Sequence, residues 1–333
     1  MTTIVFYGWP QRLGGANIER YHTGKLLSCE HEIVYLRDNP RPVFEDDAEL
    51  LEQTRQFATL VDCYAAEERT TWISHNQDAI YIGMCSGAYR NDFPLLCQNQ
   101  MKHIWVPCMC YSSDIMRFFL AQGYRPRHTV FQSLYQALCF SEVDGLVSSV
   151  IHGLYSDLDE PPVSVQIGKT ILKLCRADKD KFPEDYWAQC QEIFDRTGYL
   201  TRVVGYNDSI EEKLGKPPGC VSVHAPRSLS IAEAFAGCRY IFPGFGACVE
   251  NWPQVAYEAL AHGCTPIFER GRGGSDEMDF AHQVNGMDHF CEHLDRGQVA
   301  PQLHLNGLID SAQYVLDNAL VQWLDLIDEV EAI

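Results

Sequence analysis

Positive charge is scarce in this sequence. Its 333 residues include 26 lysines and arginines against 45 aspartates and glutamates, which gives a formal net charge of −19 at pH 7. Proteins that bind nucleic acids usually do so through clustered lysine and arginine side chains. A nucleic-acid backbone is therefore not expected as the main partner, although the composition leaves room for a local basic cleft.

Long apolar runs and paired cysteines are also missing. No stretch is long and apolar enough to span a membrane, and the first residues resemble a buried strand rather than a signal peptide. The 14 cysteines include no CxxC pair and no metal-like spacing with histidine, and Cys108 and Cys110 come nearest to one. These absences predict a cytoplasmic protein with reduced, mostly buried thiols and no bound metal.

Two glycine motifs of nucleotide-binding proteins are absent as well. No Gly-x-Gly-x-x-Gly follows a predicted strand, which excludes the dinucleotide fingerprint. The sequence Gly168-Lys169-Thr170 resembles the end of a P-loop, but valine stands at position 163, where the first glycine of that motif belongs.

What is present is the composition of a globular protein, with 46% hydrophobic and 11% aromatic residues. The length suffices for two domains. Strand-like apolar runs alternate with helical stretches, which predicts an α/β fold with parallel sheets. In the first half we expect helices at residues 18–27 and 47–69, and strands at residues 4–7, 33–36, 79–82, 103–106 and 145–150.

The boundary between the two domains is predicted in an acidic stretch at residues 157–163, which contains two consecutive prolines and suits a linker. We therefore expect an N-terminal domain at 1–160 and a C-terminal domain at 161–308. The last segment, 309–333, has an apolar face at helical spacing and is predicted to form an amphipathic helix.

The most informative stretch covers residues 238–278. Two short apolar runs, 239–242 and 265–268, predict buried strands on either side of a helix. Asn251 is of the type that begins helices, and Gly263 stands where a glycine often ends them. The stretch is thus predicted to be a strand, a helix and a second strand, followed by a glycine-rich turn.

Two carboxylates frame this unit: Glu250 at the entrance of the helix and Glu258 eight residues later. One interpretation is that both lie on a solvated face, which accounts more easily for Glu258 than for Glu250. The other is a sugar-phosphate site, because a helix N-terminus attracts phosphate and carboxylates accept hydrogen bonds from sugar hydroxyls.

The spacing of the two acids resembles the Glu-x7-Glu motif of family-4-type glycosyltransferases, which have the GT-B fold. Residues 259–266, ALAHGCTP, continue the motif. The resemblance implies that Glu250 contacts the transferred sugar and that Glu258 holds the ribose of the nucleotide. One residue departs from the family: Pro253 replaces a glycine whose amide faces phosphate or sugar, and proline has no N–H.

The resemblance therefore assigns the backbone contacts of this loop to neighbouring residues. Gln254 and Val255 are the candidates to supply the amides that Pro253 lacks. With Asn251 they complete the set of substrate-binding candidates at the start of the helix.

Two cations follow the first apolar stretch of the second half, Arg176 and Lys181. They fit either a solvated charged turn or a clamp that neutralises a departing diphosphate. Their spacing matches the Arg-x4-Lys pattern of the same glycosyltransferase family, in which the pair binds the pyrophosphate.

In the first half the resemblance depends on strand order and on Gly14 and Gly15, which precede a predicted helix. By themselves the two glycines fit a flexible turn, and they also fit a loop whose amides approach phosphate. In the family, such a loop faces the donor diphosphate. Related enzymes often carry a histidine in this half, but His75, His103 and His152 match no pattern and fit core or surface positions better.

Taken together, the resemblance implies a retaining glycosyltransferase with two Rossmann-like domains, an interdomain cleft and a C-terminal helix that packs back across both. The donor would be a UDP-sugar or another nucleotide-diphosphate sugar, the acceptor an unidentified hydroxyl or amine, and no cofactor is expected. Two alternatives stay open. One is a metal-dependent transferase that uses Asp157-x-Asp159 or Asp178-x-Asp180, and the other is a relative that binds nucleotide sugars without turnover.

Overall fold

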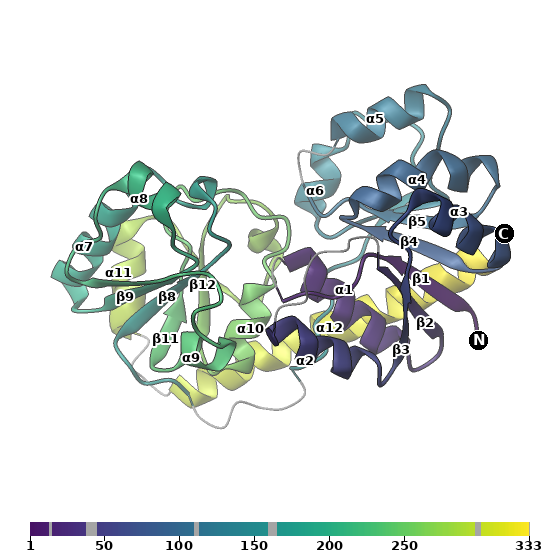
Figure 1. The fold of residues 1–333 in the computed structure, drawn as a ribbon. Helices are drawn as coiled ribbons and strands as arrows, with labels where there is room; N and C mark the ends of the chain where they lie inside the picture. Colours follow the sequence, from purple (N-terminus) through teal and green to yellow (C-terminus); the bar gives the residue numbers. More distant parts are fainter. Residues whose placement is uncertain (13–14, 38–44, 110–112, 159–164, 297–300, 333) are drawn as a thin grey trace. The chain divides into compact units, whose positions relative to one another are not determined.

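The computed structural model describes residues 1–12, 15–37, 45–109, 113–158, 165–296 and 301–332. The chain divides into two compact units. The first unit is Met1–Ser156 together with Val315–Ile333, and the second is Asp157–Tyr314. Each is built around its own parallel sheet (Figure 1).

The sheet of the first unit has the strand order β3-β2-β1-β4-β5-β6-β7. Helices α1 and α2 cover one face and α3 and α4 the other (Figure 1). Because both faces are covered, the central strands β1 and β4 are almost wholly buried. The elements are β1 (Thr3–Tyr7), α1 (Gly15–Leu27), β2 (Glu32–Arg37), α2 (Glu45–Thr54), β3 (Ala58–Asp62), α3 (Ala66–His75), β4 (Ile80–Met84), α4 (Gly87–Gln98), β5 (Lys102–Val106), α5 (Ser113–Ala121), β6 (His128–Phe131), α6 (Leu134–Cys139) and β7 (Ser148–Val150).

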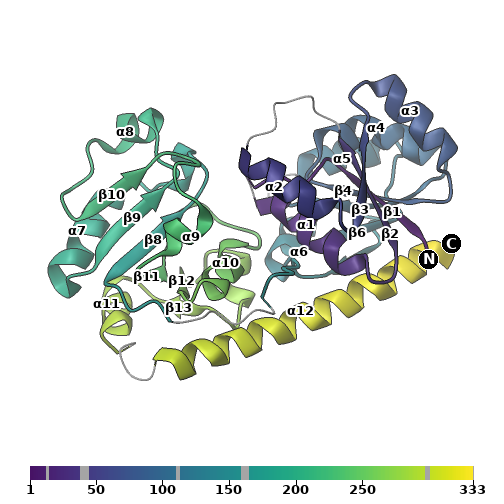
Figure 2. The same cartoon turned by 60° about the horizontal axis from the view of Figure 1, so that its bottom comes forward.

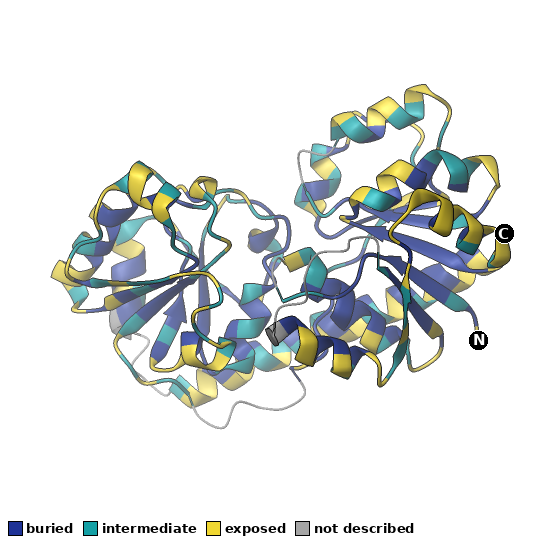
Figure 3. Ribbon diagram, viewed as in Figure 1, coloured by how far each residue is buried: buried dark blue, intermediate teal, exposed yellow. Residues whose placement is uncertain are grey.

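The sheet of the second unit has the order β10-β9-β8-β11-β12-β13. Helix α10 packs on β11 and β12, and α7 packs on β9 and on α11. Buried strand residues form the core of this sheet as well (Figure 3). Its elements are β8 (Thr170–Leu174), η1 (Lys179–Lys181), α7 (Tyr186–Thr197), β9 (Leu200–Val204), α8 (Asp208–Leu214), β10 (Val221–His224), α9 (Ile231–Phe235), β11 (Cys238–Ile241), α10 (Val255–Ala261), β12 (Thr265–Glu269), η2 (Gly274–Glu277), β13 (His282–Val284) and α11 (Met287–Arg296).

The last element is the helix α12 (Pro301–Ala332), drawn in yellow in Figure 2. It begins earlier than the predicted residue 309, and its residues up to Tyr314 belong to the second unit while the rest belong to the first. In the part of the chain that the structure describes, no helix combines the length and the apolar character needed to cross a membrane.

The predicted α/β architecture with two parallel sheets is confirmed, but two strands of the first sheet were missed. The segment 47–69, predicted to be helical, contains the strand β3 between two helices. Strand β3 lies at the edge of the sheet and is only partly buried, so its sequence ATLVD lacks the apolar character of a central strand. Strand β6 has only four residues, too few to show a period.

The helix at the centre of the most informative stretch also begins later than predicted. Asn251 does not cap it: Gln254 occupies the N-cap position, without a side-chain cap hydrogen bond, and the helix starts at Val255. The predicted helix end is confirmed, since His262 is the C-cap and Gly263 follows with a φ of 75°.

Candidate functional site

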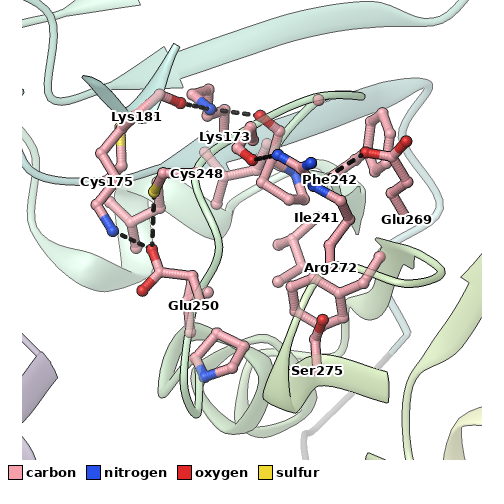
Figure 4. Close-up of a pocket in the computed structure, with 18 residues that line it drawn as sticks. Lys173, Cys175, Lys181, Ile241, Phe242, Cys248, Glu250, Glu269, Arg272 and Ser275 are labelled. Carbon is pink, nitrogen blue, oxygen red and sulfur yellow. Dashed lines mark hydrogen bonds and ion pairs between the residues drawn. The ribbon is translucent and has the colours of Figure 1, made fainter. Parts of the chain in front are cut away.

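The candidate site lies where the strand order of the second sheet reverses. Strands β8 and β11 are paired neighbours at the centre of the sheet. After β8 the chain continues to β9 on one side of this pair, and after β11 it continues to β12 on the other side. In open parallel sheets, ligands bind beyond the carboxyl ends of strands at such a reversal. A pocket lies there, and its walls come from β8, β11, β12 and the loops that follow them (Figure 4).

The central feature of the pocket is an ion pair between Lys181 and Glu250. The ammonium of Lys181 donates a hydrogen bond to the carboxylate Oε1 of Glu250, and both residues line the pocket (Figure 4). The side chain of Lys181 is 17% exposed and that of Glu250 42%. Burial is the largest single effect on the pKa of Lys181 and lowers it, but the charge and hydrogen bond of Glu250, with smaller contributions from Cys248, raise this pKa overall.

A thiol lies beside this pair. Cys248 Sγ is 3.7 Å from Glu250 Oε1. Burial, followed by the negative charge of Glu250, raises the pKa of Cys248, which keeps the thiol protonated. Cys248 is therefore a neutral neighbour of the ion pair.

The backbone of Glu250 is held by the glycine-rich turn. Gly274 N donates to Glu250 O at 3.0 Å, and Glu250 and Gly273 form an isolated parallel bridge. Gly273 has a φ of +102°, and a Cβ atom there would lie 2.5 Å from the carbonyl oxygen of Glu250. Only glycine permits this approach, so the predicted glycine-rich turn has a specific role in placing Glu250.

Sequence analysis missed a third charged residue of the pocket, Lys173. It lies within β8, is 3% exposed and lines the same pocket. Its ammonium donates to Lys181 O at 2.8 Å and also to Pro243 O. Its only sequence signal is a lysine inside an otherwise apolar strand, TILKL.

The opposite wall contains Glu269 and Arg272, which were also not predicted. Glu269 Oε2 accepts a hydrogen bond from Gly246 N at 2.7 Å and lies 3.5 Å from Arg272 Nε. Arg272 also donates to Ala247 O. The loop after β11 is therefore held from this side as well.

The structure brings some of the predicted site residues together and leaves others apart. Lys181, Glu250 and Val255 line the pocket. Asn251 and Gln254 are buried at the start of α10 and do not line it. The other two predicted residues of this unit, Arg176 and Glu258, also lie outside the lining; Arg176 is exposed just after β8, and Glu258 is half-buried on α10.

Of the two predicted glycines in the first unit, Gly15 is the exposed first residue of α1, and Gly14 lies outside the described residues. His103 is a core residue, 1% exposed, with its Nδ1 2.9 Å from Tyr89 Oη. Burial is the main cause that lowers the pKa of His103 to about 3. His75 ends α3, and His152 follows β7 with its Nδ1 2.9 Å from Gln132 O.

Of the two Asp-x-Asp pairs, the structure describes only Asp178-x-Asp180 in full, and there one carboxylate serves as a helix cap. Asp178 caps the short helix η1, where its carboxylate accepts a hydrogen bond from Asp180 N at 3.0 Å. Asp159 lies outside the described residues. Within the residues that the structure does describe, no three His, Cys, Asp or Glu side chains gather as a metal site requires.

Comparison with known proteins identifies the architecture. No protein-family model and no curated protein matches the sequence. Among solved structures, HepE of Anabaena in complex with UDP and glucose is similar with a TM-score of 0.71 at 10% identity, covering 99% of this chain and 100% of HepE. A TarM mutant of S. aureus in complex with Fondaparinux, alpha-GlcNAc-glycerol and UDP gives a TM-score of 0.72 at 9% identity, with 98% and 99% covered.

A third solved structure is AviGT4, a glycosyltransferase involved in avilamycin A biosynthesis. It gives a TM-score of 0.65 at 14% identity, covering 100% of this chain and 98% of AviGT4. Similarity at these identities establishes the fold. The two parallel-sheet units have the GT-B architecture of these glycosyltransferases.

Proposed function

We propose that this protein is a glycosyltransferase that moves a sugar from a nucleotide-diphosphate donor to an acceptor hydroxyl or amine. The observation that carries the proposal is the Lys181–Glu250 pair, which lies in a pocket at the strand-order reversal of the second sheet. A cation and a carboxylate at one point suit a ligand that joins a diphosphate to a polyhydroxylated sugar.

The comparisons support this choice of ligand. Solved structures of HepE of Anabaena contain UDP and UDP-glucose, and AviGT4 is described as a glycosyltransferase. We assign a UDP-sugar or a related nucleotide sugar as the donor of this chain on that basis. No cofactor is included in the proposed reaction.

In the proposed reaction Lys181 stabilises the negative charge that grows on the leaving diphosphate. Arg176, exposed just beyond β8, is the second cation for the same group. Because protein charges then perform this task, the reaction needs no divalent ion. We propose that the sugar is transferred with retention of its anomeric configuration, as the resemblance to family-4-type enzymes implies.

In this proposal the two acids bind different parts of the donor. Glu250 accepts hydrogen bonds from the transferred sugar, and Glu258 accepts them from the ribose. Val255, which lines the pocket at the first turn of α10, supplies an amide to the donor with Asn251 and Gln254 beside it. The assignment of Gly14 and Gly15 to the donor diphosphate rests on the family resemblance alone.

Before donor binding, Glu250 is the counter-ion of Lys181. A diphosphate that enters the pocket competes for the same ammonium and releases the carboxylate to accept hydrogen bonds from the sugar. Donor binding would therefore exchange one partner of Lys181 for another, and hydrogen bonds from sugar hydroxyls would replace the ammonium at Glu250.

The first experiment is a thermal-shift screen of nucleotide sugars, followed by hydrolysis and transfer assays with those that stabilise the protein. A specific nucleotide sugar should raise the melting temperature and be consumed. Stabilisation without turnover would favour a non-catalytic nucleotide-sugar-binding protein, and the absence of any stabilising nucleotide would contradict the proposal.

A further inference from the structure

Lys173 is a buried cation in the wall of the candidate pocket. It lies on the central strand β8, and its ammonium touches two carbonyl oxygens, those of Lys181 and Pro243. The ring centroids of Phe182 and Tyr186 lie 4.5 and 4.8 Å from Nζ. These contacts surround the ammonium with dipoles and aromatic faces rather than with a carboxylate.

Such an arrangement is costly, since an ammonium loses its hydration on burial. Burial is the main effect on the pKa of Lys173 and lowers it, and the positive charge of Lys181 lowers it further. A methionine of similar length would fill the space without that cost. The strand therefore contains a charge that packing alone does not explain.

The two carbonyl partners connect Lys173 to the ion pair. Lys181 O belongs to the residue whose own side chain contacts Glu250. Pro243 O belongs to the loop that leads from β11 to Glu250. One buried ammonium thus bonds to the backbones of both loops whose side chains form the pair.

Lys173 also changes the charge balance of the pocket. The charged residues of the lining are three cations, Lys173, Lys181 and Arg272, and two carboxylates, Glu250 and Glu269. In a chain with a net charge of −19, this pocket is locally positive. A fixed positive charge in a poorly hydrated wall attracts an anion more strongly than an exposed lysine does.

We propose that Lys173 is a positioning residue that fixes Lys181 and Glu250 relative to each other and supplies a buried positive charge to an anion subsite in this pocket. The ligand class is a diphosphate. The inference rests on the proposed function in one respect, namely that the anion is the diphosphate of the donor.

The test compares Lys173→Met with Lys173→Arg and with a control, Lys169→Met. Lys169 is exposed and directly precedes the same strand, so its replacement removes the same charge outside the pocket. Calorimetry would measure the affinity of each protein for inorganic pyrophosphate, UDP and uncharged uridine. Thermal unfolding would check that each variant is folded.

The expected result is a loss of about tenfold or more in pyrophosphate and UDP affinity for Lys173→Met, with uridine affinity nearly unchanged. Lys173→Arg should recover most of the loss, and Lys169→Met should bind like the wild type. If Lys173→Met does not fold, Lys173→Gln replaces it, because glutamine keeps a hydrogen-bond donor and loses the charge.

Two results with the variants would overturn the inference. In one, a folded Lys173→Met or Lys173→Gln protein binds pyrophosphate as the wild type does. In the other, pyrophosphate and uridine affinities fall equally, which indicates a merely structural role. If the wild type binds pyrophosphate but transfers no sugar, the proposed function fails while these comparisons still decide the role of Lys173. A wild type that binds neither pyrophosphate nor UDP would contradict the anion subsite itself.

Discussion

The ammonium of Lys181 touches the carboxylate of Glu250, although 69 residues separate them in the chain. The contact exists because β8 and β11, whose following loops carry the two residues, are paired neighbours. A charged pair in this place is well suited to a ligand with both phosphate and hydroxyl groups.

Metal dependence separates two chemical mechanisms. If Lys181 and Arg176 neutralise the leaving diphosphate, transfer activity should persist in excess EDTA. The measurement is the steady-state rate before and after chelation. Complete loss of activity that magnesium or manganese restores would instead favour the mechanism based on an Asp-x-Asp pair.

The close approach of Gly273 to Glu250 predicts a specific effect of a single methyl group. Gly273→Ala would place a Cβ atom 2.5 Å from Glu250 O, at a φ of +102°. We expect a stability loss of about 1–3 kcal/mol, from backbone strain, together with a lower kcat/KM as Glu250 shifts. Chemical denaturation and steady-state kinetics would measure the two effects.

Gly271→Ala is the matched control for this substitution. Gly271 also has a positive φ, +82°, but an added Cβ there would meet nothing within 4 Å. The Gly271→Ala variant should therefore lose stability through backbone strain but keep the kinetic constants of the wild type. An equal loss of kcat/KM in both alanine variants would show that the contact between Gly273 and Glu250 does not determine activity.

Burial of His103 predicts that stability decreases in acid. Its pKa is lowered to about 3 in the folded protein, mainly by burial, so the unfolded chain binds a proton near pH 6.5 that the folded chain does not. The free energy of unfolding should thus fall by up to about 1.4 kcal/mol for each pH unit below 6.5, until the folded pKa is reached.

His103→Gln tests this contribution, because it removes the titrating group. Denaturant unfolding from pH 7 to pH 5 should show a shallower decline for this variant than for the wild type. His75→Gln, which changes an exposed histidine at the end of α3, is the control. Identical slopes for all three proteins would contradict the prediction.

The two acids should differ in what they bind. Glu258→Ala should weaken binding of the free nucleoside diphosphate by about ten- to a hundredfold, because the ribose is present in that ligand. Glu250→Ala should lower kcat more than it changes this affinity, since its partner is the transferred sugar. Calorimetric titration beside steady-state kinetics separates the effects, and the opposite pattern would reverse the assigned roles.

Much of this architecture was predictable because buried parallel strands give apolar runs that alternate with helices. The exceptions have physical causes: β3 is a partly exposed edge strand and β6 is very short. Each of these leaves little periodic signal in the sequence.

The site was predictable only in part. Lys181 and Glu250 could be named because each stands in a recognisable pattern, but their contact depends on which strands pair. Lys173 could not be assigned a role, since its partners are backbone carbonyl oxygens that sequence patterns do not reveal. The contact of Gly273 with Glu250 likewise depends on a turn that folds back over the loop.

The most direct measurement of the central claim is the effect of Lys181→Ala on kcat/KM for the donor that the nucleotide-sugar screen identifies. Loss of one preorganised charge at a growing negative charge should reduce kcat/KM by about a hundredfold or more. Lys179→Ala, which removes an exposed lysine two residues away in η1, should leave it nearly unchanged. Equal kcat/KM values for the two folded variants would contradict the account of this pocket as the diphosphate site.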